Sequence, residues 1–237
     1  MSDQDALTPR VFLMRHGETE WAKSGRYTGT TDVELTLEGT AQVFSAARMV
    51  VGAGKLLDPS RLAHIFVSPR KRARKTFELL MSSPSSGAAN CKVTYTEDIA
   101  EWDYGNYEGL REEEIRTLRK TRGLDQEREW DIWRDGCEGG ESMQQVSNRL
   151  DRLISQIREI QRPCMNGGKP ADVLLVAHGL ILRCFFKRWL GLSVDSRLSM
   201  ILAPGAIVVL SYKKNNMSEP AFHVGIALPF AEESEKA

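Results

Sequence analysis

Residues 11–17 have the sequence VFLMRHG, an apolar run that ends in a charged pair followed by a glycine. Residues 173–179, VLLVAHG, are a second apolar run followed by a histidine and a glycine. Short apolar runs of this kind are typical of strands buried on both faces, as in a parallel sheet. Parallel sheets bind ligands at the carboxyl ends of their strands. We therefore expect His16 and His178 to face each other across one pocket at the edge of a sheet.

Strand-like and helix-like segments alternate through the rest of the chain. The expected strands are Val11–Met14, His64–Val67, Lys92–Thr96, Val173–Ala177, Ile207–Tyr212 and Ala221–Ile226. The expected helices are Thr36–Val51, Ser68–Met81, Leu110–Arg122, Glu141–Gln161 and Ile181–Leu190. This alternation predicts an α/β fold, a three-layer α/β/α sandwich with a mostly parallel sheet. We expect one domain over residues 1–237, with a loop at 82–90, a small lid insertion at about 103–140 and short disordered tails.

Charge and composition limit the classes of partner. The 237 residues include 32 basic and 32 acidic side chains, so the formal net charge is zero. This balance predicts neither a nucleic-acid partner nor a membrane partner. The first ten residues, MSDQDALTPR, are polar and unlike a signal peptide, and no apolar stretch is long enough to span a bilayer. We expect a cytoplasmic protein, and the sequence indicates no particular oligomeric state.

The cysteine spacing argues against a metal centre. None of the four cysteines lies in C-x-x-C spacing, and the four histidines add no zinc pattern to them. Free thiols in a reducing compartment are the simplest reading. We therefore predict no metal and no cofactor.

A third expected strand end carries positive charge. Residues 68–74, SPRKRAR, follow the strand His64–Val67. Arginine side chains match the geometry and charge of a phosphate group, and a neutral imidazole among them could attack phosphorus. The remaining cations would stabilise the transferring group without a metal. Gly17 and Gly179 would let the backbone approach the anion closely.

A carboxylate completes this set of groups. Residues 101–109, EWDYGNYEG, place Glu101 among aromatic side chains. Apolar surroundings favour the protonated form of a carboxyl, which suits a general acid that protonates a leaving group. Each feature alone has a simpler explanation. A His-Gly pair is often only a strand end, a basic run is often a solvated helix face, and Glu101 could be a surface carboxylate. Together, at successive strand ends, these features predict a phosphate pocket.

Five motifs, in order along the chain, resemble the histidine phosphatase superfamily in its phosphoglycerate mutase-like branch. They are residues 13–21 (LMRHGETEW), 68–76 (SPRKRARKT, for S-P-x-x-R-A-x-x-T), 101–109 (for E-x-x-x-G-x-x-E-G), 140–142 (GES) and 177–179 (AHG). The acid phosphatase and phytase branch is disfavoured. That branch follows R-H-G with x-R-x-P and uses a late His-Asp donor, whereas here ETEW follows and no histidine precedes an aspartate.

The resemblance implies three groups of site residues. The chemistry would fall to His16, the phospho-accepting nucleophile, and to Glu101, the proton donor that then activates water. The groups that bind the phosphate would be Arg15, Arg72, His178 and the amide of Gly179. The residues that contact the rest of the substrate would be Thr28, Gly29 and Tyr104.

The protonation of both histidines follows from this arrangement. His16 must be neutral at one nitrogen to attack, so we expect its other nitrogen to donate to a backbone carbonyl. Arg15 and Arg72 would lower the pKa of His16 through like-charge repulsion. His178 is expected to be protonated opposite a phosphate dianion. Trp130 and Trp133, in the lid, are expected to form a local core.

The implied activity is metal-independent hydrolysis of a small phosphorylated metabolite through a phosphohistidine. Residues 23–29, 101–109, 119–125 and 132–138 are similar to those of the fungal sedoheptulose-1,7-bisphosphatases, which favours a sugar bisphosphate such as sedoheptulose 1,7-bisphosphate. Two features depart from that group. Leu180 stands where a second histidine is usual, and the segment between Trp189 and Pro204 is shorter.

Two alternatives stay open. A phosphoglycerate mutase would use the same site, but the chain lacks the long insertion that mutases carry after the Glu101 motif. A non-catalytic module would bind a phosphorylated ligand in the same pocket. However, all five expected catalytic residues are present: His16, Glu101, Arg15, Arg72 and His178.

Overall fold

One six-stranded sheet organises the part of the chain that the computed structural model describes, residues 8–82 and 91–225. The strand order is β3-β2-β4-β1-β5-β6. The strands are β1 (Val11–Arg15), β2 (Leu62–Val67), β3 (Lys92–Tyr95), β4 (Asp172–Ala177), β5 (Ile207–Tyr212) and β6 (Pro220–Phe222). β3, β2, β4 and β1 are parallel, whereas β5 is antiparallel to β1 and β6 is antiparallel to β5. The mostly parallel sheet predicted from sequence is confirmed.

The register of β1 against β4 places the two apolar runs side by side. Val11 pairs with Val173, and Arg15 pairs with Ala177. His16 and His178, one residue further along each strand, therefore leave the sheet at the same level. β2 lies on the other side of β4, so the basic segment after β2 reaches the same edge of the sheet.

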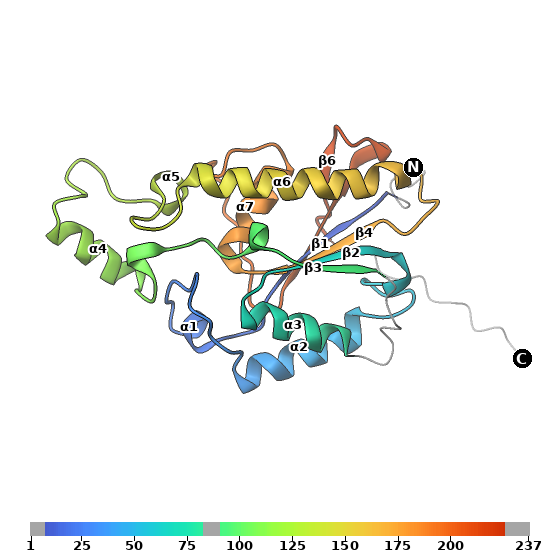
Figure 1. The fold of residues 1–237 in the computed structure, drawn as a ribbon, viewed down its shortest axis with the longest axis horizontal. Helices are drawn as coiled ribbons and strands as arrows, with labels where there is room; N and C mark the ends of the chain where they lie inside the picture. Colours follow the sequence, from blue (N-terminus) through green and yellow to red (C-terminus); the bar gives the residue numbers. More distant parts are fainter. Residues whose placement is uncertain (1–7, 83–90, 226–237) are drawn as a thin grey trace, which may run out of the picture.

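Helices cover both faces of the sheet (Figure 1). They are α1 (Glu20–Lys23), α2 (Leu37–Val50), α3 (Lys71–Met81), α4 (Glu112–Thr121), α5 (Ile132–Asp135), α6 (Met143–Gln161) and α7 (Gly179–Trp189). Short 3-10 turns lie at Pro59–Arg61, Glu97–Ile99, Gly105–Tyr107, Arg162–Cys164 and Lys213–Asn215. α2 and α3 lie on one side of the sheet, and α6 and α7 lie on the other (Figure 1).

The two faces of the sheet bury two separate cores. Along β1, Phe12 and Met14 belong to a cluster that contains residues of α2 and α3. Val11 and Leu13, which alternate with them, belong to a cluster that contains residues of α6 and α7. Alternate side chains of a strand point to opposite faces, so a strand covered on both faces must be apolar throughout. This confirms the three-layer α/β/α sandwich.

Polar caps fix where the longer helices begin. The Thr36 hydroxyl accepts from the Gly39 amide at the start of α2, and Ser142 forms a reciprocal capping box with Gln145 at the start of α6. α3 begins at Lys71 rather than at Ser68, so the predicted start of this helix is wrong. Pro69 disfavours helical backbone in Ser68, the residue before it, and Arg70, the N-cap of α3, is still extended at φ −67° and ψ 139°.

The carboxyl-terminal part shows a second difference from the prediction. The last strand, expected over Ala221–Ile226, ends at Phe222 within the described residues. Ile226 itself, the loop at 83–90 and both expected disordered tails lie outside the described residues. All four cysteines carry free thiols, as expected. Within the described ranges, no helix is both long enough and apolar enough to cross a membrane.

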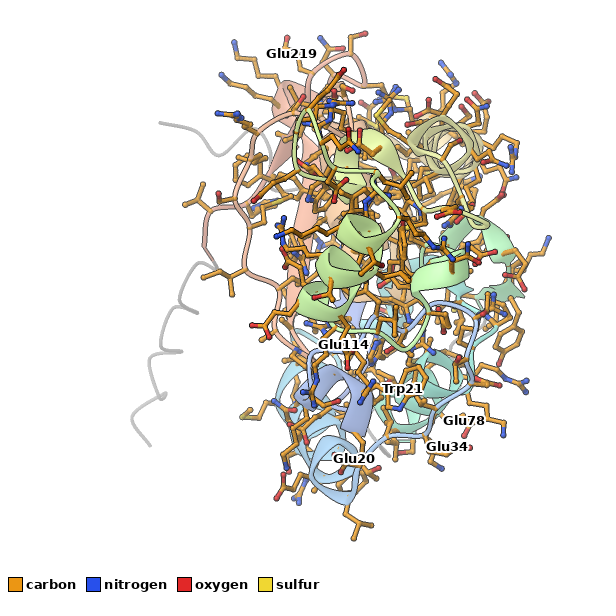
Figure 2. The ribbon with its side chains drawn as sticks, turned by 90° about the vertical axis from the view of Figure 1, so that its left-hand side faces the viewer. Glu20, Trp21, Glu34, Glu78, Glu114 and Glu219 are labelled. Atoms are coloured by element: carbon orange, nitrogen blue, oxygen red, sulfur yellow. The ribbon has the colours of Figure 1, made fainter. Side chains whose placement is uncertain are left out.

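Residues 103–140 project from one end of the sandwich and carry α4 and α5 (Figure 1). Figure 2 looks onto this end of the molecule, where Trp21 of α1 and Glu114 of α4 are labelled. Trp130 is buried there, and its Nε1 donates to the Gly136 carbonyl at 2.8 Å. Trp130 thus forms the local core expected for it, whereas Trp133 lies at the cavity described below.

Candidate active site

Three neighbouring strands end in polar side chains that meet at one edge of the sheet. His16 follows β1, His178 follows β4 and Ser68 follows β2. The imidazole rings of His16 and His178 are 5.1 Å apart between centroids and are inclined at 60°. The two histidines that the sequence placed across one pocket are therefore neighbours.

His16 is held as a neutral imidazole with one free nitrogen. Its Nδ1 lies 2.7 Å from the Gly17 carbonyl oxygen, which can only accept, so Nδ1 carries the proton and Nε2 carries a lone pair. Burial lowers the pKa of His16 to about 3, and the nearby charges of Arg72 and Arg15 add to this effect. Repulsion by the arginines is the cause predicted from sequence, but burial lowers the pKa more.

The loop that carries His16 is packed tightly between two helices. The Gly17 amide donates to the Thr76 hydroxyl of α3 at 3.1 Å. A Cβ at Gly17 would lie 2.8 Å from Val43 and 2.9 Å from the Gly39 carbonyl oxygen, both on α2. A side chain at position 17 would therefore push the nucleophile loop away from α2, and the glycine is required by this close approach.

His178 is neutral in this structure, and its protonated form opposite a phosphate dianion stays a prediction. The Arg72 Nε donates to His178 Nδ1 at 3.0 Å, so that nitrogen carries no proton. His178 Nε2 lies 2.6 Å from the Ser68 hydroxyl. Burial lowers the pKa of His178 well below its ordinary value, and the adjacent Arg72 charge lowers it further. The Arg72 guanidinium thus lies beside Nδ1 and favours the neutral ring, whereas a carboxylate at the same place would favour the protonated ring.

Arg72 is fully buried and binds mainly to the protein itself. Besides His178, its guanidinium donates to the carbonyl oxygens of Thr28, Gly29 and Thr31 at 2.8, 3.2 and 3.0 Å. These bonds use most of its five N–H groups. Arg72 thus fixes the backbone of the loop at 28–31 and the imidazole of His178.

Glu108 holds the same loop from its other side. Its carboxylate accepts from the Gly29 amide at 2.9 and 3.0 Å and from the Thr31 amide at 2.9 Å. Gly29 therefore belongs to the support of the site, because both its amide and its carbonyl are used within the protein.

Arg15, next to His16, has an unused donor. Its Nη1 donates to the Leu202 carbonyl at 2.6 Å, whereas its buried Nε has no hydrogen-bond partner among the described residues. A Cβ at Gly179 would lie 3.1 Å from both Cζ and Nε of Arg15. Gly179 thus allows the guanidinium to lie against the first turn of α7. A buried, unpaired donor is costly, so this Nε indicates an anion-binding position.

Glu101 accepts hydrogen bonds from backbone amides, an environment that differs from the apolar one expected from sequence. Its Oε1 accepts from Trp102 at 3.0 Å and from Ile181 at 2.9 Å, and its Oε2 accepts from Leu180 at 3.1 Å. Leu180 and Ile181 belong to the first turn of α7, so Glu101 caps this helix through space. Oε2, with a single amide partner, has the more available oxygen lone pair.

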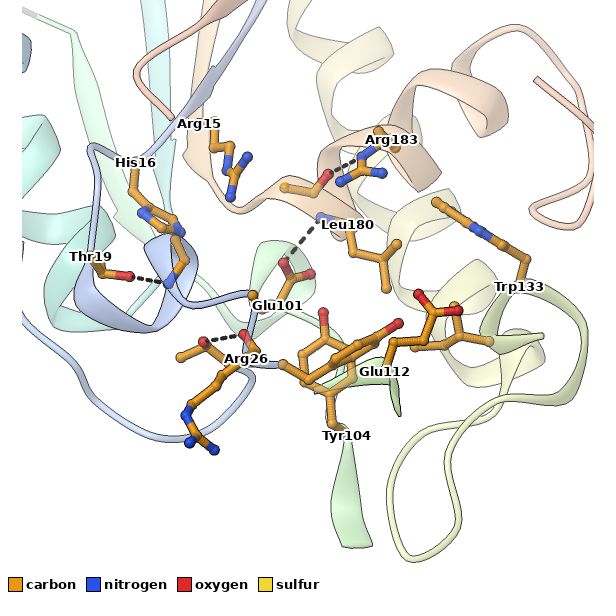
Figure 3. A pocket seen from close by; sticks show the side chains of 16 residues that line it. Arg15, His16, Thr19, Arg26, Glu101, Tyr104, Glu112, Trp133, Leu180 and Arg183 are labelled. Carbon is orange, nitrogen blue, oxygen red and sulfur yellow. Dashed lines mark hydrogen bonds between the residues drawn. The ribbon is translucent and has the colours of Figure 1, made fainter. Parts of the chain in front are cut away.

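These groups border a cavity of about 380 Å³ (Figure 3). Five of the residues expected to bind or react line it together with Gly179: Arg15, His16, Thr28, Glu101 and Tyr104. The remaining expected residues, Arg72, His178 and Gly29, lie behind this wall and hold it in place. Tyr104 packs edge-on against Tyr27, with ring centroids 4.9 Å apart.

The cavity also contains residues that the sequence did not assign to the substrate site. They are Arg183 and Leu180 of α7, Trp133 and Ile132 of α5, Glu112 of α4, and Arg26. Arg183 lies one helical turn after Gly179 and donates to its carbonyl at 3.0 Å. The four-residue spacing from Gly179 could have identified Arg183, but no pattern in the sequence indicates that α5 packs against α7.

Metal-binding groups do not gather in the described ranges. Within residues 8–82 and 91–225, no three histidine, cysteine, aspartate or glutamate side chains lie where they could hold one metal ion. The positive groups of this site are arginine side chains and backbone amides, which bind anions directly.

Comparison with known proteins gives concordant matches over nearly the whole chain. The family model of the histidine phosphatase superfamily (branch 1) matches residues 11–221. The sedoheptulose 1,7-bisphosphatase of Saccharomyces cerevisiae is 39% identical over 98% of this chain and 97% of that protein. The acid phosphatase of Mycobacterium tuberculosis is 37% identical over 81% of each chain. A solved structure of an open reading frame from Mycobacterium tuberculosis has a TM-score of 0.69 at 32% identity and covers 91% of this chain and 96% of that chain.

Proposed function

The chain belongs to the histidine phosphatase superfamily and is a phosphatase, and we propose that it hydrolyses a sugar bisphosphate through a phosphohistidine on His16. The observation that carries this proposal is the state of the His16 imidazole. Its Nδ1 proton is held by the Gly17 carbonyl and its pKa is lowered to about 3, so Nε2 keeps a lone pair at neutral pH. Such a nitrogen can attack phosphorus without first losing a proton.

In the first step, His16 Nε2 forms a bond to phosphorus while the ester P–O bond breaks. The electron pair of that bond goes to the leaving oxygen, which takes a proton from Glu101. Arg15 contributes its unpaired Nε–H and its positive charge to the oxygens of the transferring group. The Gly17 carbonyl stabilises the charge that the imidazole acquires.

In the second step, the Glu101 carboxylate takes a proton from water. The water oxygen forms a bond to phosphorus while the P–N bond breaks, and the electron pair returns to Nε2. His16 is then neutral again, Glu101 is protonated, and inorganic phosphate leaves. Each turnover consumes one water and requires no redox change.

The preference for two phosphates rests on Arg183. Its terminal nitrogens have no hydrogen-bond partner among the described residues, although it lines the same cavity as His16. Figure 3 shows Arg183 on the side of the cavity away from His16. A substrate with phosphates at both ends, such as sedoheptulose 1,7-bisphosphate, would place one at His16 and the other near Arg183.

Phosphate release from a panel of compounds tests this function. We would assay sedoheptulose 1,7-bisphosphate, fructose 1,6-bisphosphate, glycerol 3-phosphate, 3-phosphoglycerate and a phosphopeptide, with EDTA present throughout. The wild type should release phosphate from the sugar bisphosphates, and His16→Ala should lower the rate at least about 1,000-fold.

Other results would contradict the proposal in distinct ways. Isomerisation of 3-phosphoglycerate without net release would identify a mutase. Binding of a phosphorylated ligand without turnover of any compound would identify a binding module. Undiminished activity of His16→Ala would refute the nucleophile, and loss of activity in EDTA would refute a metal-independent reaction.

A further inference from the structure

Lys187 of α7 is a buried cation outside the catalytic machinery. Its side chain is only 3% exposed. It has no ion-pair partner among the residues that the structure describes. Its Nζ instead donates to the Val194 carbonyl at 2.7 Å and lies 3.8 Å from the centre of the Trp133 ring. A buried ammonium needs compensation, and here a carbonyl dipole and the face of an indole supply it.

This contact joins two elements that are far apart in the sequence. Trp133 lies on α5, a four-residue helix within the segment 103–140, whereas Lys187 lies near the end of α7. A four-residue helix has little stability of its own and depends on contacts with its surroundings. The ammonium of Lys187 therefore fixes the orientation of the Trp133 indole against α7.

Trp133 is also part of the cavity wall. It lines the same cavity as His16 and Glu101, next to Leu180 and Ile132. Figure 3 shows Trp133 reaching from α5 toward Leu180 and Arg183. Trp133, Leu180 and Ile132 form an apolar wall in a cavity whose other residues are mostly charged or hydroxylated. Aromatic and apolar walls of this kind pack against the C–H groups of a ligand, while polar groups fix its orientation.

We propose that Trp133 determines specificity by packing against the carbon chain of the substrate, and that Lys187 is the positioning residue that holds it there. This inference rests on the proposed function, since the carbon chain is that of a sugar phosphate. A substrate with a short chain would react at His16 without reaching this wall. Recognition by Trp133 should therefore alter KM for a long substrate and leave the chemical step unchanged.

The kinetic test uses two variants of Lys187 and two substrates. Lys187→Met keeps the length of the side chain and removes the charge, whereas Lys187→Arg keeps the charge and can stack on the indole. We expect Lys187→Met to raise KM for sedoheptulose 1,7-bisphosphate about fivefold, with kcat and the KM for glycerol 3-phosphate unchanged. Lys187→Arg should restore most of the loss, and Trp133→Leu should reproduce it. An equal loss on both substrates, or no change in KM, would overturn the proposal.

A spectroscopic measurement reads the position of Trp133 independently of activity. The chain has five tryptophans, and the fluorine NMR signal of Trp133 in 5-fluorotryptophan-labelled protein is assigned by its absence in Trp133→Phe. This signal should shift in Lys187→Met and stay in place in Lys187→Arg. An unchanged signal in Lys187→Met would refute the positioning role. If the wild type hydrolyses neither substrate, the proposed function fails together with the substrate role of Trp133, and the fluorine spectrum still decides the role of Lys187.

Discussion

Acid should destabilise this protein through His16, by an amount that follows from its burial. The pKa of this imidazole is about 3 in the folded chain and 6.5 without the protein environment. Between these two pH values the unfolded chain binds a proton that the folded chain does not bind. The resulting stability is fully present above pH 6.5 and is lost as the pH falls toward 3. At about pH 4.5, two pH units below the unfolded value, the loss is about 3 kcal/mol.

The measurement compares urea unfolding of the wild type and of His16→Gln, followed by circular dichroism at about pH 7 and about pH 4.5. Glutamine removes the titrating ring. When the pH is lowered from about 7 to about 4.5, the free energy of unfolding should therefore decrease in both proteins, but by about 3 kcal/mol less in His16→Gln than in the wild type. His178 is present in both proteins, so its contribution largely cancels in the comparison. The exposed His223 provides a control, and His223→Gln should follow the wild type. An equal loss of stability in His16→Gln and wild type would refute the buried neutral imidazole on which the mechanism depends.

Two further substitutions test the acid and the phosphate-binding groups. Glu101→Gln should slow the hydrolysis of sugar phosphates by about 100-fold or more. The hydrolysis of p-nitrophenyl phosphate should slow much less, because p-nitrophenolate leaves without a proton. Equal slowing of both reactions would argue against Glu101 as the acid. Gly179→Ala places a Cβ 3.1 Å from Cζ and Nε of Arg15 and should displace the guanidinium, which lowers kcat/KM by about tenfold. Gly168→Ala, where a Cβ meets nothing within 4 Å, should leave the kinetics unchanged.

The part of the site that the sequence predicted is the part built on the parallel strands. Buried parallel strands require continuous apolar runs, and the residue after each run lies at the edge of the sheet. The sequence therefore predicted that His16 and His178 are neighbours, and they are, because their strands pair in register from Val11 opposite Val173 onward. The alternation of strands and helices likewise indicated the sandwich.

The hydrogen-bond partners of His178 and the surroundings of Glu101 could not be predicted, because both depend on contacts between distant segments. The ring of His178 is neutral because Arg72, over 100 positions earlier in the chain, donates to it. Glu101 lies among aromatic residues in sequence but contacts the amides of Leu180 and Ile181 in space. Such contacts leave no local periodicity or composition in the sequence.

The cavity wall formed by α5 could not be predicted from the sequence, for a different reason. Residues 123–140 are polar and lack a helical repeat, so the short helix Ile132–Asp135 has no pattern of its own. Its position depends on Asp131, which caps it, and on the contact between Trp133 and Lys187. Lys187, a single buried lysine on an otherwise apolar helix face, is the one local sign of this packing. The sequence does not show which aromatic ring it contacts.

The hydrogen bonds between Glu101 and α7 link the reaction to the mechanics of the molecule. A carboxylate at a helix amino terminus stabilises the helix by about 1 kcal/mol, and a protonated carboxyl does so less well. If Glu101 exchanges a proton twice in every turnover, the first turn of α7 is alternately released and held again. Arg183 and Lys187 lie on this same helix. The position of the surface that meets the far end of the substrate therefore depends on whether Glu101 is protonated. Proton transfer to the departing alcohol would then tighten this surface, and the surface would loosen only in the second step, when Glu101 takes a proton from water.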